Sequence, residues 1–203
     1  MRVHYIMVLD RSGSMRGDKP EPNPWSDLLK SVKGFLKGLS DGADTSKDVK
    51  VSIIGYDDVS RVLYEKVSAQ EDLVRRIDWT GGDTDFERPL ADAYRVALRS
   101  QDEFDRFHIY FMSDGSAAYP AVAIDEFKGD SKLYDNAEVK FVAFGKDADQ
   151  FTLGRMKAAF KGGKLHVATT SAELQKTFDE EIEHLTQALA DHRKAQLALD
   201  WVC

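Results

Sequence analysis

Cysteine is almost absent from this sequence, because the only one is the final residue, Cys203. A single cysteine can neither form a disulfide within the chain nor supply the thiolates of a structural zinc site. No apolar run approaches the roughly 20 residues that a membrane-spanning helix needs, and no leader-like segment precedes the first apolar stretch. These absences predict a cytoplasmic protein that makes no contact with a membrane.

Clustered positive charge is also lacking. The 203 residues carry a net charge of −7 and contain no long run of Lys or Arg. Nucleic-acid binding needs basic patches that contact phosphates, so we expect no nucleic-acid partner. A hydrophobic share of 42% and a charged share of 31% are typical of a globular protein, and the length suits one domain over residues 1–203.

Apolar strands and amphipathic helices alternate along the chain. Apolar runs predict strands at 3–9, 49–56, 61–67, 107–112, 139–144 and 165–168. Helical spacing of apolar residues predicts helices at 24–40, 70–77, 86–100, 120–128 and 148–160. The second and third strands are joined by only four residues and must pair antiparallel. The pattern predicts an α/β fold: a doubly wound, mostly parallel, Rossmann-like sheet of about six strands, with one antiparallel edge strand and helices on both faces.

Residues 171–203 are expected to form a C-terminal helix and tail. Ser171 is the predicted N-cap, and the helix extends to about residue 200. Its apolar face consists of Leu174, Phe178, Ile182, Leu185 and Leu189. The tail is apolar again, with Leu197, Leu199, Trp201 and Val202. This tail could dock a partner or lie on the domain's own surface, and the second interpretation is favoured.

The stretch Asp10-Arg11-Ser12-Gly13-Ser14 directly follows the first predicted strand. Its carboxylate and two hydroxyls can turn toward one point, because Gly13 lets the backbone curl tightly between the serines. Hard oxygen donors of this kind suit Mg²⁺, Mn²⁺ or Ca²⁺. The same residue types also form ordinary polar turns, so this stretch alone leaves a turn and a metal site equally open.

Two later stretches favour the metal site. Thr84 lies in an oxygen-rich loop, 80–85, before a predicted helix, and Asp114 directly follows the strand 107–112. Ligands of doubly wound sheets bind at the carboxyl ends of the central strands, where these loops could converge. Five donors and a water would give the six-fold coordination of Mg²⁺: Asp10, Ser12, Ser14, Thr84 and Asp114. The neighbouring pair Asp57-Asp58 is expected to be a solvated hairpin turn instead.

The ordered motifs Asp-x-Ser-x-Ser, Gly-Gly-x-Thr-Asp and Ser-Asp-Gly resemble those of the von Willebrand factor A domain, which carries a metal-ion-dependent adhesion site. The resemblance covers nearly the whole chain and is nearest to stand-alone intracellular members. It implies direct metal coordination by Ser12, Ser14 and Thr84, with Asp10 and Asp114 acting through water. It further implies that Mg²⁺, or Mn²⁺ or Ca²⁺ in its place, captures an Asp or Glu carboxylate of a protein partner.

Neutral hydroxyl ligands explain why such a metal would attract an anion, because they leave most of its charge uncompensated. Asp83 departs from the small residue that commonly precedes the threonine in the family. Its charge could tighten cation binding or weaken the capture of an acidic ligand, and both outcomes stay open. Trp25 and Tyr119 are candidate partner contacts near the site, although packing is the favoured role for each.

The sequence leaves two alternatives to a metal-dependent protein-binding module. The domain could be a scaffold with a structural metal that acts through its loops or its C-terminal helix. A metal-dependent phosphotransfer enzyme is disfavoured, because a related enzyme fold needs a second Asp where Ser12 stands. The sequence also lacks a phosphate-binding loop and a Gly-x-Ser-x-Gly elbow, and its five histidines are scattered. The sequence therefore predicts a protein that is not an enzyme.

Overall fold

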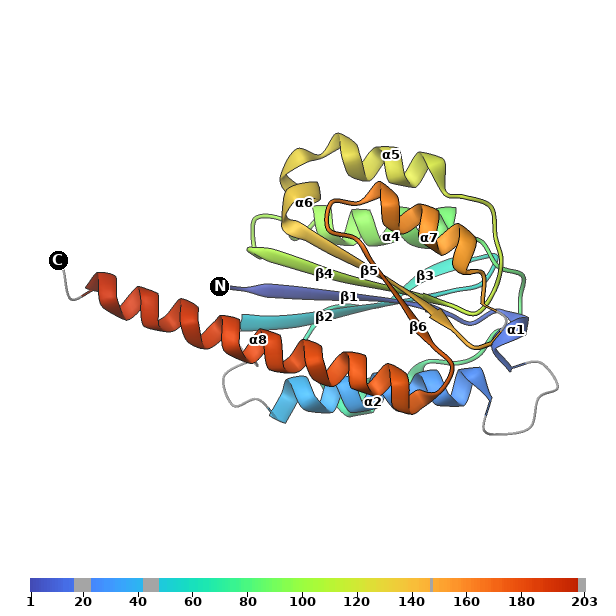
Figure 1. Ribbon diagram of the computed structural model, residues 1–203, viewed down its shortest axis with the longest axis horizontal. Helices are drawn as coiled ribbons and strands as arrows, with labels where there is room; N and C mark the ends of the chain where they lie inside the picture. Colours follow the sequence, from blue (N-terminus) through green and yellow to red (C-terminus); the bar gives the residue numbers. More distant parts are fainter. Residues whose placement is uncertain (17–22, 42–47, 147, 201–203) are drawn as a thin grey trace.

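The computed structural model describes residues 1–16, 23–41, 48–146 and 148–200 (Figure 1). The predicted turn at 42–47 and most of the predicted loop at 17–24 lie outside these ranges. Pro24 begins a helix, as its missing N–H and fixed φ favour. The side chains of Leu199, Trp201 and Val202, assigned to the apolar tail, also lie outside the described residues.

Six strands form one sheet in the order β3-β2-β1-β4-β5-β6. Their bounds are β1 Val3–Asp10, β2 Val49–Tyr56, β3 Ser60–Val67, β4 Arg106–Ser113, β5 Ala137–Phe144 and β6 Lys164–Ala168. Only β3, at one edge, pairs antiparallel, and the other neighbours are parallel. The predicted fold class is therefore confirmed, including the antiparallel edge strand. The predicted bounds of the strands differ from the observed ones by at most two residues.

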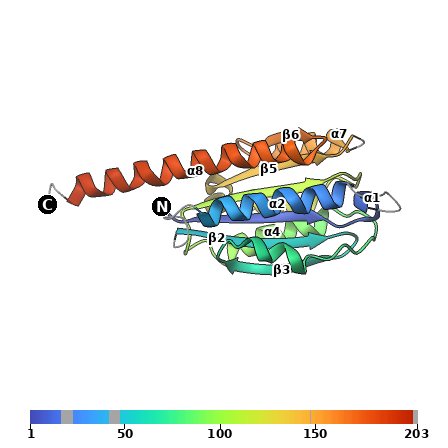
Figure 2. The same ribbon diagram turned by 90° about the horizontal axis from the view of Figure 1, so that it is seen from below.

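Helices cover both faces of the sheet (Figures 1 and 2). One face packs against α2 (Pro24–Asp41), the 3₁₀ helix η1 (Glu71–Arg76) and α8 (Ser171–Asp200). The other face packs against α4 (Glu87–Leu98), α5 (Ala121–Gly129), α6 (Ser131–Asn136) and α7 (Gln150–Ala159). The short helices α6 and α1 (Gly13–Arg16) were not predicted, because each is too short to show an apolar period.

Strand β1 lies in the middle of the sheet, and all eight of its residues are buried. Tyr5 and Met7 face α2 and α8, whereas Ile6 and Val8 face α4 and α5. Successive side chains of a strand point to opposite faces, so a strand covered on both sides must be apolar throughout. This requirement explains why the run that precedes Asp10 is apolar except for His4.

The terminal helix α8 packs beside α2 and then runs past the end of the sheet (Figure 1). Thr170, not Ser171, caps it: the Thr170 hydroxyl accepts a hydrogen bond from the Glu173 N–H at 3.3 Å, and the Glu173 carboxylate accepts one from the Thr169 N–H at 2.7 Å. Leu189 is buried, but Leu197 is 60% exposed, so the own-surface interpretation of the tail is wrong at this residue. None of the helices that the structure describes is long and apolar enough to cross a membrane.

Candidate metal site

The candidate metal site lies at the carboxyl ends of β1 and β4, which are neighbouring parallel strands. Asp10 is the last residue of β1, and Asp114 directly follows β4. Ser12 and Ser14 belong to the turn that opens α1, which Figure 1 shows beyond the end of β1. Parallel strands that end at one edge therefore bring together two stretches that are 100 residues apart in the sequence.

A chain of short hydrogen bonds joins four of the five predicted ligands. One carboxylate oxygen of Asp10 accepts the Ser12 N–H at 2.8 Å. The Ser12 and Ser14 hydroxyls lie 3.0 Å apart, and the Ser14 hydroxyl donates to Asp114 at 2.6 Å. Four oxygen-bearing side chains thus converge on the space above the end of β1.

Thr84 is the fifth predicted ligand, and it lies close to Gly115. A Cβ placed on Gly115 would stand 2.8 Å from the Thr84 hydroxyl oxygen and 3.5 Å from the Ser14 hydroxyl oxygen. The loop that carries Thr84 is held against the Asp10 loop by two backbone hydrogen bonds, Gly13 N–H to Gly82 at 2.8 Å and Gly81 N–H to Arg11 at 3.0 Å. Thr84 therefore lies beside the serines, and glycine at 115 leaves room for it.

Two supporting residues were missed by the sequence analysis. The Ser113 hydroxyl donates to the second carboxylate oxygen of Asp10 at 2.6 Å, and Ser113 is itself fully buried. The Trp79 indole N–H donates to the Ser12 carbonyl at 2.9 Å, while the guanidinium of Arg16 lies 5.4 Å from the centre of its ring. Ser113 stands directly before Asp114 and could have been noticed, but nothing in the sequence relates Trp79 to Ser12.

The prediction for the Asp57-Asp58 pair was half right. Asp58 is exposed, as a hairpin turn predicts, but Asp57 is 7% exposed and therefore buried. Asp57 accepts the Val59 N–H at 2.7 Å and packs against Gly82 of the loop that carries Thr84. Its role is structural, because it fixes that loop. The other predicted contact residue at this edge, Trp25, is only 6% exposed and packs in the core.

Asp10 is a buried carboxylate whose hydrogen-bond donors are neutral. Burial raises its pKa from 3.8 to about 6, although the hydrogen bonds from Ser113 and Ser12 act in the opposite direction. Within the described residues, no three His, Cys, Asp or Glu side chains are grouped so that they could hold a metal. A cation at this edge would therefore rest on hydroxyl oxygens with a few carboxylates. That donor set fits Mg²⁺, Mn²⁺ or Ca²⁺.

The sequence profile of the von Willebrand factor type A domain matches residues 5–116, which is more than half of the chain and includes every residue of the candidate site. The chain belongs to the von Willebrand factor type A domain family. No curated protein sequence gives a significant match to it.

Solved structures of other von Willebrand A domains share the fold. A "von Willebrand factor type A" protein from Catenulispora acidiphila is 22% identical, with a TM-score of 0.68 over 89% of this chain and 42% of that one. The mussel byssus protein "proximal thread matrix protein 1", solved "with zinc occupied MIDAS motif", is 11% identical, with a TM-score of 0.70 over 91% and 46%. The pilus adhesin SpaC from Lactobacillus rhamnosus GG is 13% identical, with a TM-score of 0.71 over 91% and 30%. The chain thus spans less than half the length of each of these three proteins.

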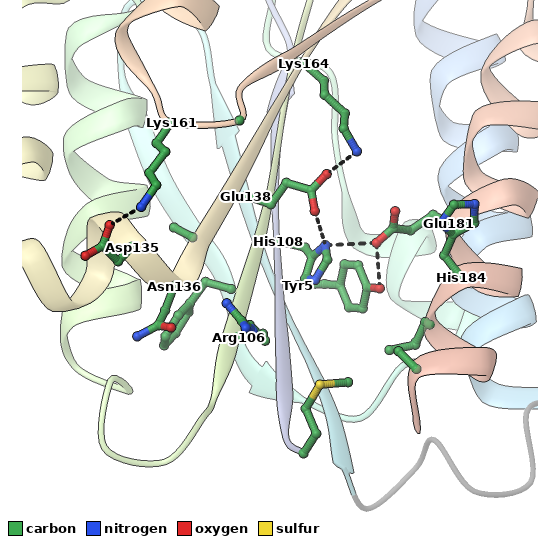
Figure 3. Close-up of a pocket in the computed structure, with 16 residues that line it drawn as sticks. Tyr5, Arg106, His108, Asp135, Asn136, Glu138, Lys161, Lys164, Glu181 and His184 are labelled. Atoms are coloured by element: carbon green, nitrogen blue, oxygen red, sulfur yellow. Dashed lines mark hydrogen bonds and ion pairs between the residues drawn. The ribbon is translucent and has the colours of Figure 1, made fainter. Parts of the chain in front are cut away.

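A second polar cluster of this von Willebrand A domain lies between α8 and the amino-terminal halves of the strands (Figure 3). We call it the α8 cluster: Tyr5, His108, Tyr110, Glu138, Lys140, Lys164 and Glu181. Several of these residues line an open pocket of about 710 Å³. Glu181 of α8 is its centre, since this carboxylate lies 2.9 Å from His108, accepts the Tyr5 hydroxyl at 3.0 Å and pairs with Lys140.

Charge is balanced inside the α8 cluster. Burial alone would raise the pKa of Glu181, but the hydrogen bond and charge of His108, followed by those of Lys140, outweigh burial and hold this pKa well below its usual range. Glu138 is paired with Lys164 at 2.6 Å and with Lys140 at 3.4 Å. His108 and these carboxylates are far apart in the sequence, and only the fold places Glu138 and Glu181 beside this histidine. Those carboxylates and Lys140 satisfy one another, as in a structural ion network.

Proposed function

We propose that this chain is a divalent-cation-dependent protein-binding module. Ser12, Ser14 and Thr84 would coordinate the cation directly, and Asp10 and Asp114 would hold it through water. The observation that carries the proposal is the hydrogen-bonded series from the Asp10 carboxylate through Ser12 and Ser14 to Asp114, at the carboxyl edge of the sheet. A buried carboxylate surrounded by neutral hydroxyls has the charge and the hard oxygen donors that Mg²⁺ requires.

The cation would supply Lewis acidity and an open coordination position at the surface of the domain. Three neutral hydroxyls leave most of its charge uncompensated, so the position favours an anionic oxygen. An Asp or Glu side chain of a partner protein is the ligand that fits, because Ser14 of the site is exposed and within reach of a partner. A pilus adhesin is among the proteins that share this fold, and interaction without catalysis is accordingly our proposal for this chain.

A scaffold with a structural metal is the alternative that uses the same five oxygens. The scaffold and the binding module differ in their response to metal removal. If the cation is structural, chelation destabilises the domain and has no separate effect on partner binding. If it captures a carboxylate, chelation abolishes partner binding while the domain stays folded.

Calorimetric titration of Mg²⁺ and Mn²⁺ into chelator-stripped protein tests the site. We expect saturable binding in the wild type and none in Asp10→Asn, which keeps the volume of the side chain but removes its charge. Asp72→Asn is the matched control, because Asp72 is an exposed carboxylate of η1 that pairs with the nearby Arg75. Binding by Asp10→Asn equal to that of the wild type would contradict the proposed site.

A further inference from the structure

A group of two exposed side chains and one half-buried tyrosine lies near the candidate metal site. We call it the Arg155 patch: Tyr119, Phe151 and Arg155. Phe151 is 75% exposed, the highest exposure of any large hydrophobic residue that the structure describes. The Arg155 guanidinium lies 4.4 Å from the centre of the Tyr119 ring and 6.0 Å from that of the Phe151 ring.

The patch lies on two neighbouring segments near Asp114, the loop after β4 and the start of α7. Tyr119 is in the loop between β4 and α5, and Phe151 is in the first turn of α7. The Ser116 hydroxyl donates to Asp149 at 2.9 Å and so joins these loops, while a Cβ on Gly145 would lie 3.6 Å from the Asp114 Cβ. Figure 1 shows the first turns of α5 and α7 at the same end of the sheet as α1. A ligand that reached the candidate metal site would meet this surface on the α7 side.

The local geometry is fixed before any ligand arrives. Asp149 caps α7 by accepting the N–H groups of Phe151 and Thr152 at 3.1 and 3.0 Å. Residues 151 and 155 are one helical turn apart, so their side chains share a face of α7. The buried side of α7 consists of Thr152, Leu153 and Met156. Phe151 and Arg155 are therefore not needed to attach the helix to the sheet.

The charge of Arg155 indicates what the patch would bind. Among the described residues Arg155 forms no ion pair, and its planar group rests on aromatic faces. A guanidinium held in this way presents several N–H donors in one plane, which matches a carboxylate. The exposed ring of Phe151 beside it matches an apolar or aromatic side chain.

We propose that the Arg155 patch is a second contact surface for the partner segment that supplies a carboxylate to the metal. The segment it fits carries a second acidic side chain, which pairs with Arg155, and a neighbouring apolar or aromatic side chain, which packs on Phe151. This inference rests on the proposed metal-dependent function, and it names the chemistry of the partner beyond a single Asp or Glu.

A displayed peptide library with one fixed central Asp and random flanks tests the inference. The library is selected on the wild-type protein in Mg²⁺ and eluted with a chelator. We expect the eluted sequences to be enriched in a second acidic residue and in an apolar or aromatic residue, each at a constant distance from the fixed Asp. Enriched peptides are then synthesised, and their affinities are measured by fluorescence anisotropy.

Four variants separate the outcomes. Arg155→Gln and Phe151→Ser should each weaken peptide binding about five- to tenfold, with Mg²⁺ affinity unchanged. Arg75→Gln, which removes an exposed arginine of η1, should have no effect, and Asp10→Asn should abolish binding. Equal affinities for the wild type, Arg155→Gln and Phe151→Ser, with binding still lost in Asp10→Asn, would overturn the patch but keep the proposed function. A library that yields no Mg²⁺-dependent peptide would contradict both.

Discussion

The two polar clusters of this domain place buried carboxylates in opposite electrostatic surroundings. Asp10, at the carboxyl edge, accepts hydrogen bonds from neutral groups, and burial raises its pKa to about 6. Glu181, on the side of α8 that faces the sheet, is also buried, but His108 and Lys140 hold its pKa well below the usual range. The α8 cluster carries its own counter-charges, whereas the cluster around Asp10 is suited to a cation that comes from solution.

Removing the charge of Glu181 should give the largest effect. Glu181→Gln would leave Lys140 without its main counter-charge and His108 without its carboxylate partner in a buried place, and we expect the free energy of unfolding to fall by about 3 kcal/mol. Urea denaturation at pH 7 measures this change. Glu180→Gln is the control on the exposed side of α8, where a 4.0 Å pair with Lys176 should contribute less than about 0.5 kcal/mol. A loss of unfolding free energy below about 1 kcal/mol in Glu181→Gln would contradict the view that the α8 cluster depends on its internal ion pairs.

The same kind of substitution at the carboxyl edge should behave differently. In chelator, Asp10→Asn should be at least as stable as the wild type, because it removes a buried charge that no basic group of the described residues neutralises. Addition of Mg²⁺ at about 100 times its dissociation constant should stabilise the wild type by about 2.7 kcal/mol and leave Asp10→Asn unchanged. Thermal unfolding with and without Mg²⁺ measures both effects. A wild type that Mg²⁺ does not stabilise would remove the distinction between the two clusters.

Acidification sharpens the comparison in the metal-free protein. The folded-state pKa of Asp10, about 6, is above its ordinary value of 3.8, so its ionisation destabilises the fold above pH 6 and protonation relieves this cost as the pH falls toward 4. The stability advantage of Asp10→Asn over the wild type should therefore shrink by about 2.5 kcal/mol between pH 7 and pH 4. Both proteins contain His4, whose pKa burial lowers to about 4, so its own acid-dependent loss of stability cancels in the difference. An advantage that stayed constant over this range would contradict the assignment.

A methyl group at Gly115 gives the smallest expected effect. Its Cβ would approach the Thr84 hydroxyl to 2.8 Å, so Thr84 must shift away from the serines. We expect Gly115→Ala to weaken Mg²⁺ binding about tenfold, or about 1.4 kcal/mol, by calorimetry. Gly129→Ala is the matched control, because no atom lies within 4 Å of its added Cβ. Unchanged affinity in Gly115→Ala would indicate that Thr84 does not bind the metal.

Much of the fold and the candidate site could be predicted from sequence because the signals are local. The run Val3–Leu9 had to be apolar on both faces of a central strand, and the four-residue link after Tyr56 required an antiparallel hairpin. Asp10, Ser12 and Ser14 stand within one turn, and Asp114 follows a strand that was recognised in the same way. The rule that parallel strands present their carboxyl ends at one edge was enough to bring these segments together.

The sequence by itself therefore determined the order of strands and helices, the edge at which polar side chains gather and their oxygen chemistry. Only the tertiary structure decided which charges meet beneath α8. Glu138 and Lys140 stand in a strand and Glu181 in a helix, each like an ordinary solvent-facing residue of its own element. Their pairing depends on where α8 crosses the sheet, and that position is set by the packing of many side chains, including Phe35 against Phe178 at 4.7 Å between ring centres. No local pattern in a sequence encodes such a crossing, because the residues that meet there lie up to 176 positions apart.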